Sequence, residues 1–173
     1  TVTPDANGCK GDAFDIVVTV NPNGQVNAVA DQTLCNGDST LAVTFATTNT
    51  GSGTTTYNWV NDNTAIGLAA NGTGDISSFT ATSSAVAPIV GNITVTPVYE
   101  NNGVSCTGTA ETFSITVNPS PLVSFSEADQ VIVTGETTTA VDLTSPTTDV
   151  TFAWTVSVPT GITGVTTLTG TDN

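Results

Sequence analysis

The sequence predicts an all-β protein made of tandem β-sandwich repeats, and three observations support this prediction. Threonine makes up about a fifth of the 173 residues, and threonine favours strands over helices. Short stretches of alternating apolar and polar residues are separated by Gly, Asn, Asp and Pro, as expected for sheets joined by tight turns. The chain also repeats itself at a spacing of about 97 residues.

Two strands have the clearest alternation. In Glu111–Asn118, one side carries Phe, Ile and Val, and the other carries Thr and Ser. Residues 92–98 alternate in the same way, and Pro97 predicts a position late in that strand or at a sheet edge. Further strands are predicted at residues 25–29, 40–47, 55–60, 76–82, 131–133, 138–143 and 150–156. Because Leu, Glu and Lys are scarce, little in the sequence favours helix.

The repeat is clearest in two long matches. Residues 1–22 read TVTPDANGCKGDAFDIVVTVNP, and residues 94–119 read TVTPVYENNGVSCTGTAETFSITVNP. Both contain TVTP, an Asn/Gly-rich turn, Cys-x-Gly, Phe-x-Ile and TVNP. After each TVNP, Ala-Asp-Gln at 30–32 matches 128–130, and Tyr-x-Trp at 57–59 matches Phe-x-Trp at 152–154. The offsets are close to the size of one immunoglobulin-like domain, about 100 residues.

The phase of the repeat divides the chain into three parts. Residues 1–22 are expected to be the C-terminal hairpin of one unit, residues 23–119 a complete unit, and residues 120–173 the N-terminal part of the next. Asn-Pro pairs at 21–22 and 118–119 mark the joints, where proline stiffens the connection. Because neither flanking part holds all the strands of a unit, we expect the chain to be a segment of a longer protein.

The composition excludes several classes of function. There is no His, and 15 acidic residues face one basic residue, Lys10, for a net charge of -14. Imidazole catalysis is therefore ruled out, and nucleic acid or an anionic membrane surface would be repelled. The aspartates at 15, 31, 38, 75, 129 and 142 are isolated in sequence and give no sign of the paired acids of a glycosidase. No apolar run is long enough for a membrane helix, and no cofactor is expected.

Six motifs in fixed order resemble a known type of repeat. They are CNGDST at 35–40, Tyr-x-Trp at 57–59, IGLAANGTGDI at 66–76, VTP at 95–97, CTG at 106–108 and TVNP at 116–119. Together they resemble the PKD-like, immunoglobulin-like repeats of giant surface adhesins in gliding Bacteroidota, the SprB-type gliding adhesins among them. The likeness spans nearly the whole chain. It departs from an ordinary PKD domain after Trp59, where Val-Asn-Asp-Asn stands in place of Phe-Gly-Asp-Gly.

This resemblance implies a structural, non-enzymatic role outside the cell. It implies secretion by the type IX system and a place at the cell surface, in a long adhesin filament that supports adhesion and gliding motility. The expected partners are neighbouring repeats of the same chain and, through other parts of the parent, the gliding machinery and an extracellular polysaccharide or a solid surface. The alternative is a carbohydrate-binding module of a secreted polysaccharide-degrading enzyme, and a secreted hydrolase is a third interpretation.

The three cysteines occupy two positions of the repeat. Cys35 precedes the second strand of the complete unit, Cys106 lies in its last hairpin, and Cys9 corresponds to Cys106 in the preceding unit. The preferred interpretation is a Cys35–Cys106 disulfide, with the partner of Cys9 outside this segment. Two free thiols or another pairing are the alternatives. Three cysteines without histidine or a Cys-x-x-Cys spacing argue against zinc.

Trp59 and Trp154 hold equivalent positions in the third strand of their units. An aromatic residue at a fixed position of the repeat is typical of the core tryptophan of an immunoglobulin-like domain, so both are predicted to be core residues. The alternative is an exposed platform for sugar rings.

Two further sites have both a structural and a chemical interpretation. Asp62, between two asparagines, and Asp-Ala-Asn-Gly at 5–8 offer oxygen ligands to Ca²⁺. The same residue types form tight turns, which is the favoured interpretation. Asp-Ser-Thr at 38–40 resembles a short acceptor for O-glycosylation in this bacterial group, which makes Ser39 the candidate serine. Alternatively, the Ser39 hydroxyl serves the turn before the next strand.

Overall fold

A six-stranded sheet is the main element of the computed structural model, which describes residues 1–127, 129–158, 160–165 and 169–171. The strand order is β3 (Gln32–Cys35), β8 (Glu111–Asn118), β6 (Ile89–Asn101), β4 (Thr54–Asn61) and β5 (Asn71–Thr73), with β7 (Val104–Thr107) paired to β6. Only the β3–β8 pair is parallel within this sheet. In the described ranges, the one helical element is a short 3-10 turn, η1 (Thr64–Ile66), so the all-β prediction is confirmed.

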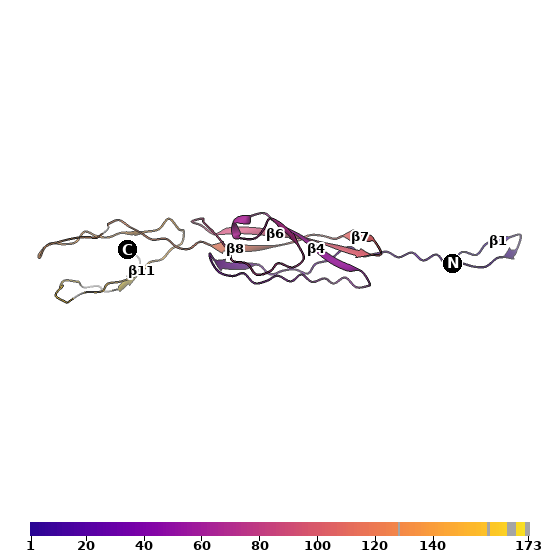
Figure 1. Cartoon of the computed structure of the whole chain (residues 1–173), viewed down its shortest axis with the longest axis horizontal. Helices are drawn as coiled ribbons and strands as arrows, with labels where there is room; N and C mark the ends of the chain where they lie inside the picture. The colour runs from indigo at the N-terminus through magenta and orange to yellow at the C-terminus, as the bar shows by residue number, and fades with distance from the viewer. Residues whose placement is uncertain (128, 159, 166–168, 172–173) are drawn as a thin grey trace.

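The chain is drawn out along one axis (Figure 1). At one end, β1 (Asp5–Ala6) and β2 (Cys9–Lys10) form a small hairpin that an extended segment joins to the central sheet. At the other end, β9 (Ser124–Phe125) pairs with β10 (Leu143–Thr144), and β11 (Ala153–Thr155) pairs with β12 (Thr169–Thr171). The described part of the chain contains no helix long and apolar enough to span a membrane.

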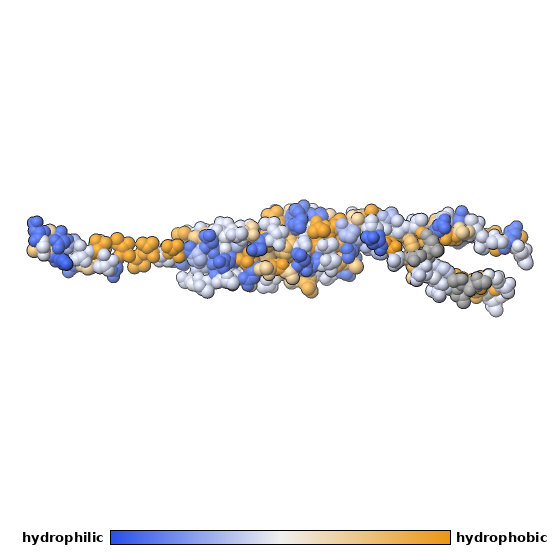
Figure 2. All heavy atoms as spheres, turned by 180° about the vertical axis from the view of Figure 1, so that it is seen from behind, coloured by the Kyte–Doolittle hydropathy of each residue, from blue (hydrophilic) through white to orange (hydrophobic). Residues whose placement is uncertain are grey.

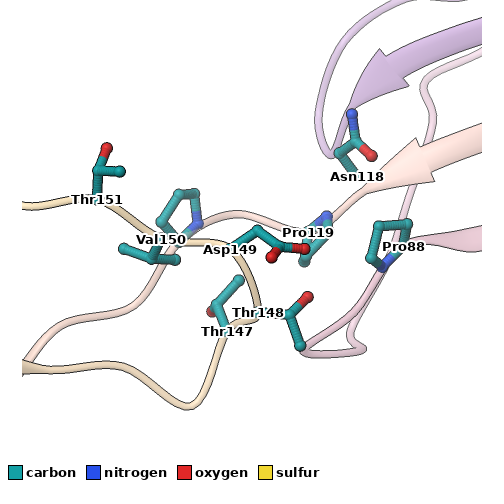
Figure 3. A pocket seen from close by; sticks show the side chains of 9 residues that line it. Pro88, Asn118, Pro119, Thr147, Thr148, Asp149, Val150 and Thr151 are labelled. Atoms are coloured by element: carbon teal, nitrogen blue, oxygen red, sulfur yellow. The ribbon is translucent and has the colours of Figure 1, made fainter.

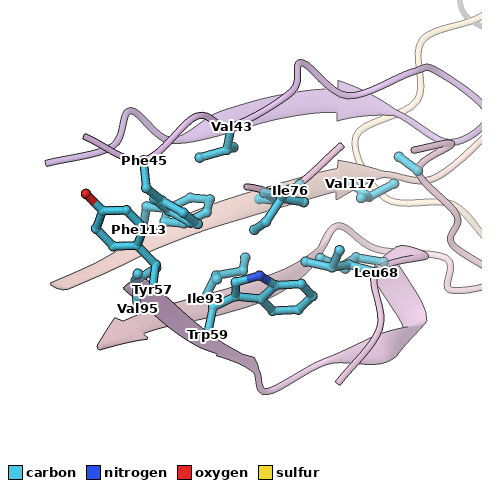
Figure 4. Packing of buried hydrophobic residues seen from close by; sticks show 13 residues of the cluster. Val43, Phe45, Tyr57, Trp59, Leu68, Ile76, Ile93, Val95, Phe113 and Val117 are labelled. Carbon is cyan, nitrogen blue, oxygen red and sulfur yellow. The ribbon is translucent and has the colours of Figure 1, made fainter. Parts of the chain in front are cut away.

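The core lies between the sheet and a covering layer, which we define as residues 26–31, 39–47 and 76–82 (Figure 4). From the sheet, β6 and β8 turn alternate residues inward, and Ile115 of β8 has no exposed surface. From the covering layer, Phe45 packs against this face with its ring centroid 5.3 Å from that of a tyrosine in β4. The threonine-rich sides of the strands face outward.

The covering layer departs from the prediction. The segments predicted as strands at 40–47 and 76–82 are joined by isolated bridges rather than by a continuous ladder, and no strand or bridge forms at 25–29. Side chains replace part of the missing ladder; for example, the Phe45 N–H donates to the Asp75 carboxylate at 2.9 Å. After the central sheet, no strand forms at 131–133, and the strands predicted at 138–143 and 150–156 are reduced to β10 and β11.

Pro97 lies where the sequence did not place it. The predicted strands Glu111–Asn118, 55–60 and 92–98 are confirmed as β8 and as parts of β4 and β6. Pro97, however, sits inside the central strand β6, opposite Tyr57 of β4. On the other side of β6, the ladder with β8 ends at Val95 and the ladder with β7 begins at Val98. The missing N–H of Pro97 falls in this gap, so the sheet tolerates the proline.

One kind of contact recurs at the spacing of the repeat: a glutamine side chain makes two hydrogen bonds with the backbone of one residue in another segment, which we call a clamp. The Gln32 side chain donates to the Leu41 carbonyl at 3.1 Å and accepts from the Leu41 N–H at 2.9 Å. Gln130 makes the same two bonds with Thr139, at 3.0 and 2.7 Å. A second bond repeats at the same offset, from the Cys35 N–H to Asp38 and from the Val133 N–H to Glu136. The repeat in the sequence is therefore accompanied by a repeat of hydrogen bonds between side chains and the backbone.

The hairpin contacts recur too, and they shift the predicted alignment by two residues. The bond from the Gly11 N–H to the Pro4 carbonyl matches that from Gly108 to Pro97, at 2.9 Å in both. Val2 bridges Phe14, whereas Val95 pairs with Glu111. In this register Phe14 corresponds to Glu111 and not, as the shared Phe-x-Ile motif predicts, to Phe113.

Trp59→Ala tests the packing of the core. The Trp59 side chain is 7% exposed, its ring lies over Gly72 of β5, and its indole N–H donates to the Gly74 carbonyl at 3.2 Å. We expect the substitution to lower the free energy of unfolding by about 3–5 kcal/mol, the usual cost of removing a large buried aromatic side chain. Trp154→Ala, at the equivalent but half-exposed position, should cost less. Urea unfolding followed by circular dichroism measures both, and equal losses would contradict this account.

Candidate functional site

The joint between the central unit (residues 23–119) and the segment that follows it brings several separate parts of the chain together. A pocket of about 400 Å³ lies there (Figure 3). Its lining comes from the loop before β6, the exit of β8 and the loop after β10: Pro88, Asn118, Pro119, Pro121 and residues 147–151. Three prolines in one joint restrict its backbone torsions and favour a stiff connection.

Asn36 holds the joint from the side of the central unit. Its backbone N–H donates to the Asn118 carbonyl at 2.8 Å, and its side-chain amide donates to the Ser120 hydroxyl at 3.1 Å. Its side-chain oxygen accepts the Ser83 N–H at 2.8 Å. One residue thus ties the turn after β3 to the loop before β6 and to the chain leaving β8.

Two more hydrogen bonds complete the joint. The Thr148 N–H donates to the Val86 carbonyl at 3.0 Å, which connects the following segment to the central unit. The Leu122 N–H donates to the hydroxyl of Thr147, a buried residue, at 3.2 Å. Sequence reasoning located the joint at its Asn-Pro pair but missed this loop, whose Ser-Pro-Thr-Thr sequence at 145–148 carries only a general turn signal.

The joint at the other end of the central unit uses a pair of asparagines. The Asn101 side-chain amide donates to the Asn21 side-chain oxygen at 3.0 Å, and Asn21 donates to the Asn101 carbonyl at 3.3 Å. Asn21 and Asn118 occupy the same position in the two TVNP motifs. Amide side chains thus contribute hydrogen bonds to both joints.

The predicted Cys35–Cys106 disulfide is wrong in this structure, where all three cysteines are free. Cys35 pairs with Asn118 at the exit end of β8, whereas Cys106 pairs with Tyr99 near the far end of β6. Along β6 the two positions are separated by about ten residues, or about 33 Å. A disulfide requires Cα atoms within about 7 Å. The cysteines therefore mark opposite ends of the central unit.

Asp62 makes a contact between two segments of the central unit. Its carboxylate accepts the Asn92 backbone N–H at 2.7 Å and the Asn92 side-chain amide at 2.8 Å, which ties the loop after β4 to β6. The side-chain bond first, then the backbone bond, lowers the pKa of Asp62 below its usual value, because both favour the ionised form. In the described residues, no three His, Cys, Asp or Glu side chains gather as metal ligands would.

The other acidic loop forms a turn, and the candidate serine lies just after one. In the sequence at 5–8, the Gly8 N–H donates to the Asp5 carboxylate at 3.1 Å, and Asn7 and Gly8 have positive φ angles, as a tight hairpin requires. Ser39 is exposed and bridges Thr80. Its hydroxyl is accessible to solvent, and its glycosylation stays a prediction.

The two tryptophans are only partly alike. Trp59 is a core residue, as predicted. Trp154 lies over Gly170 as Trp59 lies over Gly72, but it is half-exposed and lines an open groove. Because Trp59 is inside, the two rings do not form a shared sugar platform.

Comparisons with protein families, with curated proteins and with solved structures found no match. The motifs and the internal repeat therefore carry the functional argument.

Asn36→Ala should loosen the joint and destabilise the central unit. The change removes the hydrogen bonds to Ser120 and Ser83, and an unsatisfied, partly buried partner costs about 1–3 kcal/mol. Hydrogen exchange measured by NMR should show faster exchange of the Ser83 amide. Asn27→Ala, an exposed position in the covering layer, is the matched control and should leave it unchanged. Identical exchange in both variants would exclude the role assigned to Asn36.

Asp62→Asn should change how stability depends on pH. A pKa that is lowered on folding means that the ionised carboxylate stabilises the folded chain at any pH above the unfolded value of about 3.9. This contribution is lost as the pH falls through the lower, folded pKa. The melting temperatures of the wild type and the variant should therefore differ at neutral pH and converge in acid, as calorimetry can show. A difference in melting temperature that persists unchanged in strong acid would contradict this explanation.

Proposed function

We propose that this chain is a segment of a tandem array of PKD-like, immunoglobulin-like sandwiches in a long secreted surface adhesin of the SprB type. In this proposal the units are non-enzymatic spacers, secreted by the type IX system, that extend a filament used in adhesion and gliding. The observation that carries the proposal is the recurrence of the same backbone clamps along an extended chain, such as those of Gln32 and Gln130. The link to this family of adhesins rests on the resemblance of the sequence motifs.

The geometry suits a spacer. The central strand β6 covers 13 residues and so extends about 43 Å along the direction of the chain. The segment after the first hairpin enters the central unit at the end where β7 lies, and the chain leaves β8 at the opposite end of the long axis (Figure 1). Each unit therefore adds its full length to an array, and the proline joints limit bending.

The surface chemistry agrees with this role. Fifteen acidic residues against one basic residue make neighbouring filaments repel one another at low salt, which keeps them separate. The outward sides of the strands are rich in threonine, which is polar but uncharged. Tyr57 and Trp59 are buried in the central unit, so they do not provide the exposed aromatic rings that a carbohydrate-binding module would use.

Filament length tests the proposal. Deleting one unit, residues 23–119, from the parent protein should shorten the surface filament by roughly 45 Å, the span of one sheet, while secretion continues. Deleting several units should shorten it in proportion, and electron microscopy of the cells measures this. A filament of unchanged length, or tight binding of a defined glycan by the isolated unit, would point instead to a binding module.

A further inference from the structure

The first and the last strand of the central unit lie side by side and run in the same direction. β3 and β8 form a parallel pair, with Gln32 opposite Ile115 and Cys35 opposite Asn118. The chain reaches the unit at the end where β7 lies and leaves β8 at the opposite end (Figure 1). Tension on the two ends of the unit therefore pulls β3 and β8 in opposite directions along their own axes.

This direction of loading matters for the strength of the pair. The hydrogen bonds of a parallel pair are evenly spaced along both strands. When the strands are pulled past each other, all of these bonds are stretched together and must break together. When two strands are instead pulled apart sideways from one end, the bonds are stretched and broken one at a time. The same bonds thus resist more force in the first direction than in the second.

Further hydrogen bonds lengthen the contact between the two strands. Before β3, the Asp31 carboxylate accepts the Ser114 N–H at 2.6 Å. After β3, the Asn36 N–H donates to the Asn118 carbonyl at 2.8 Å. The Asn36 side-chain amide also donates to the Ser120 hydroxyl at 3.1 Å. The contact therefore begins before the paired residues of β3 and continues past the end of β8.

The β3–β8 contact, which comprises residues 31–36 and 114–120, has one side in the hydrophobic core. Leu34 of β3 packs against the core, and Ile115 and Val117 of β8 have no exposed surface. These apolar side chains shield the bonds from water on this side, and β3 cannot slide without drawing Leu34 out of the core. Rupture of the contact then opens the core of the whole unit.

The hydrogen bonds that precede β3 do not form a ladder. The Gly24 N–H donates to the Cys106 carbonyl at 3.1 Å, and the Asn27 N–H donates to the Ala46 carbonyl at 2.8 Å. Single bonds to different segments break in turn under tension, and the load passes on to β3. In the described part of the chain, β3 lies at the edge of the sheet and has β8 as its one strand partner, whereas β8 also pairs with β6. The β3–β8 contact therefore decides whether the unit stays folded.

We propose that the β3–β8 contact bears the tension on the unit and keeps it folded while load passes along the chain. The inference deepens the proposed function and rests on it for the source of the tension, because a spacer in a filament transmits load through its own backbone. Asn36 connects the contact to the next joint, since it bonds both to the end of β8 and to Ser120 beyond it. The load from the following unit therefore enters directly beside the contact.

Single-molecule pulling on the 173-residue chain in two directions tests the proposal. In one protein the handles are attached to Cys9 and to Val123→Cys, both exposed positions, and Cys35→Ser and Cys106→Ser remove the other thiols. A single extended segment links the first hairpin to the central unit, so this pull reaches the unit through its own backbone (Figure 2). In the second protein the handles are attached to Cys35 and to Val123→Cys, with Cys9→Ser and Cys106→Ser. Both handles then lie at the same end of the β3–β8 contact.

The unfolding force should depend on the direction of the pull. It should be about twofold higher, or more, through positions 9 and 123 than through positions 35 and 123, because only the first pull loads the bonds together. Release of residues 23–119 in the first protein should lengthen the chain by roughly 300 Å, at about 3.5 Å per residue less the folded span, which identifies the event. Equal forces in the two directions would overturn the proposal, and they would leave the filament-length test of the spacer function untouched.

Two aspartate variants of the first protein separate strength under load from ordinary stability. Asp31 and Asp62 are both exposed, and each carboxylate accepts a backbone N–H, at 2.6 Å from Ser114 and at 2.7 Å from Asn92. Asp31→Ala should lower the unfolding force, because its bond belongs to the β3–β8 contact. Asp62→Ala is the matched control: it also loses a bond to the Asn92 side chain, but both bonds lie outside the contact, so the force should be unchanged. A loss of force in Asp62→Ala as large as that in Asp31→Ala would contradict the proposal.

Discussion

The apolar face shared by β6 and β8 is the constraint on which the rest of the structure depends. These strands alternate, with threonine outward and branched apolar residues inward, so the inward face must be covered. Where the covering layer is present, Ile93, Ile115 and Val117 have no exposed surface. Where it is absent, at Val18 and Val20, the same pattern stays exposed. Burial therefore depends on all strands of a unit meeting, rather than on any one strand.

The sequence predicted the strands of this sheet better than the layer that covers it. β8 has the predicted bounds because one side is buried and the other exposed along its whole length. The same reasoning found the covering segments at 40–47 and 76–82, but it overestimated their regularity. The alternation of apolar and polar residues indicates which side of a segment is buried. It does not indicate which segment its backbone groups bond to. Side chains such as Asp75 and Thr40 accept hydrogen bonds from backbone N–H groups of this layer that would otherwise bond to a neighbouring strand.

The cysteines and the joint show where a sequence lacks the needed information. The repeat placed Cys35 and Cys106 in their elements, but only the parallel pairing of β3 with the end of β8 shows that they lie at opposite ends. A disulfide depends on that distance and not on position in the repeat. Asn36 was missed for a related reason: its three bonds join segments far apart in sequence, and the next unit has Thr134 at this position.

The residues and hydrogen bonds that recur at equivalent positions show which features define a repeat unit. Phe45 becomes Leu143 and Cys35 becomes Val133, so core and strand positions change within apolar chemistry. Such exchanges cost little when volume is roughly kept. The Gln32 clamp, by contrast, returns with the same atoms in the same roles in Gln130. The clamped backbone groups are exposed, so their recurrence reflects the path of the chain rather than a cost of burial. Between these two units, the hydrogen bonds of the irregular layer are thus kept more closely than the identity of the apolar core side chains.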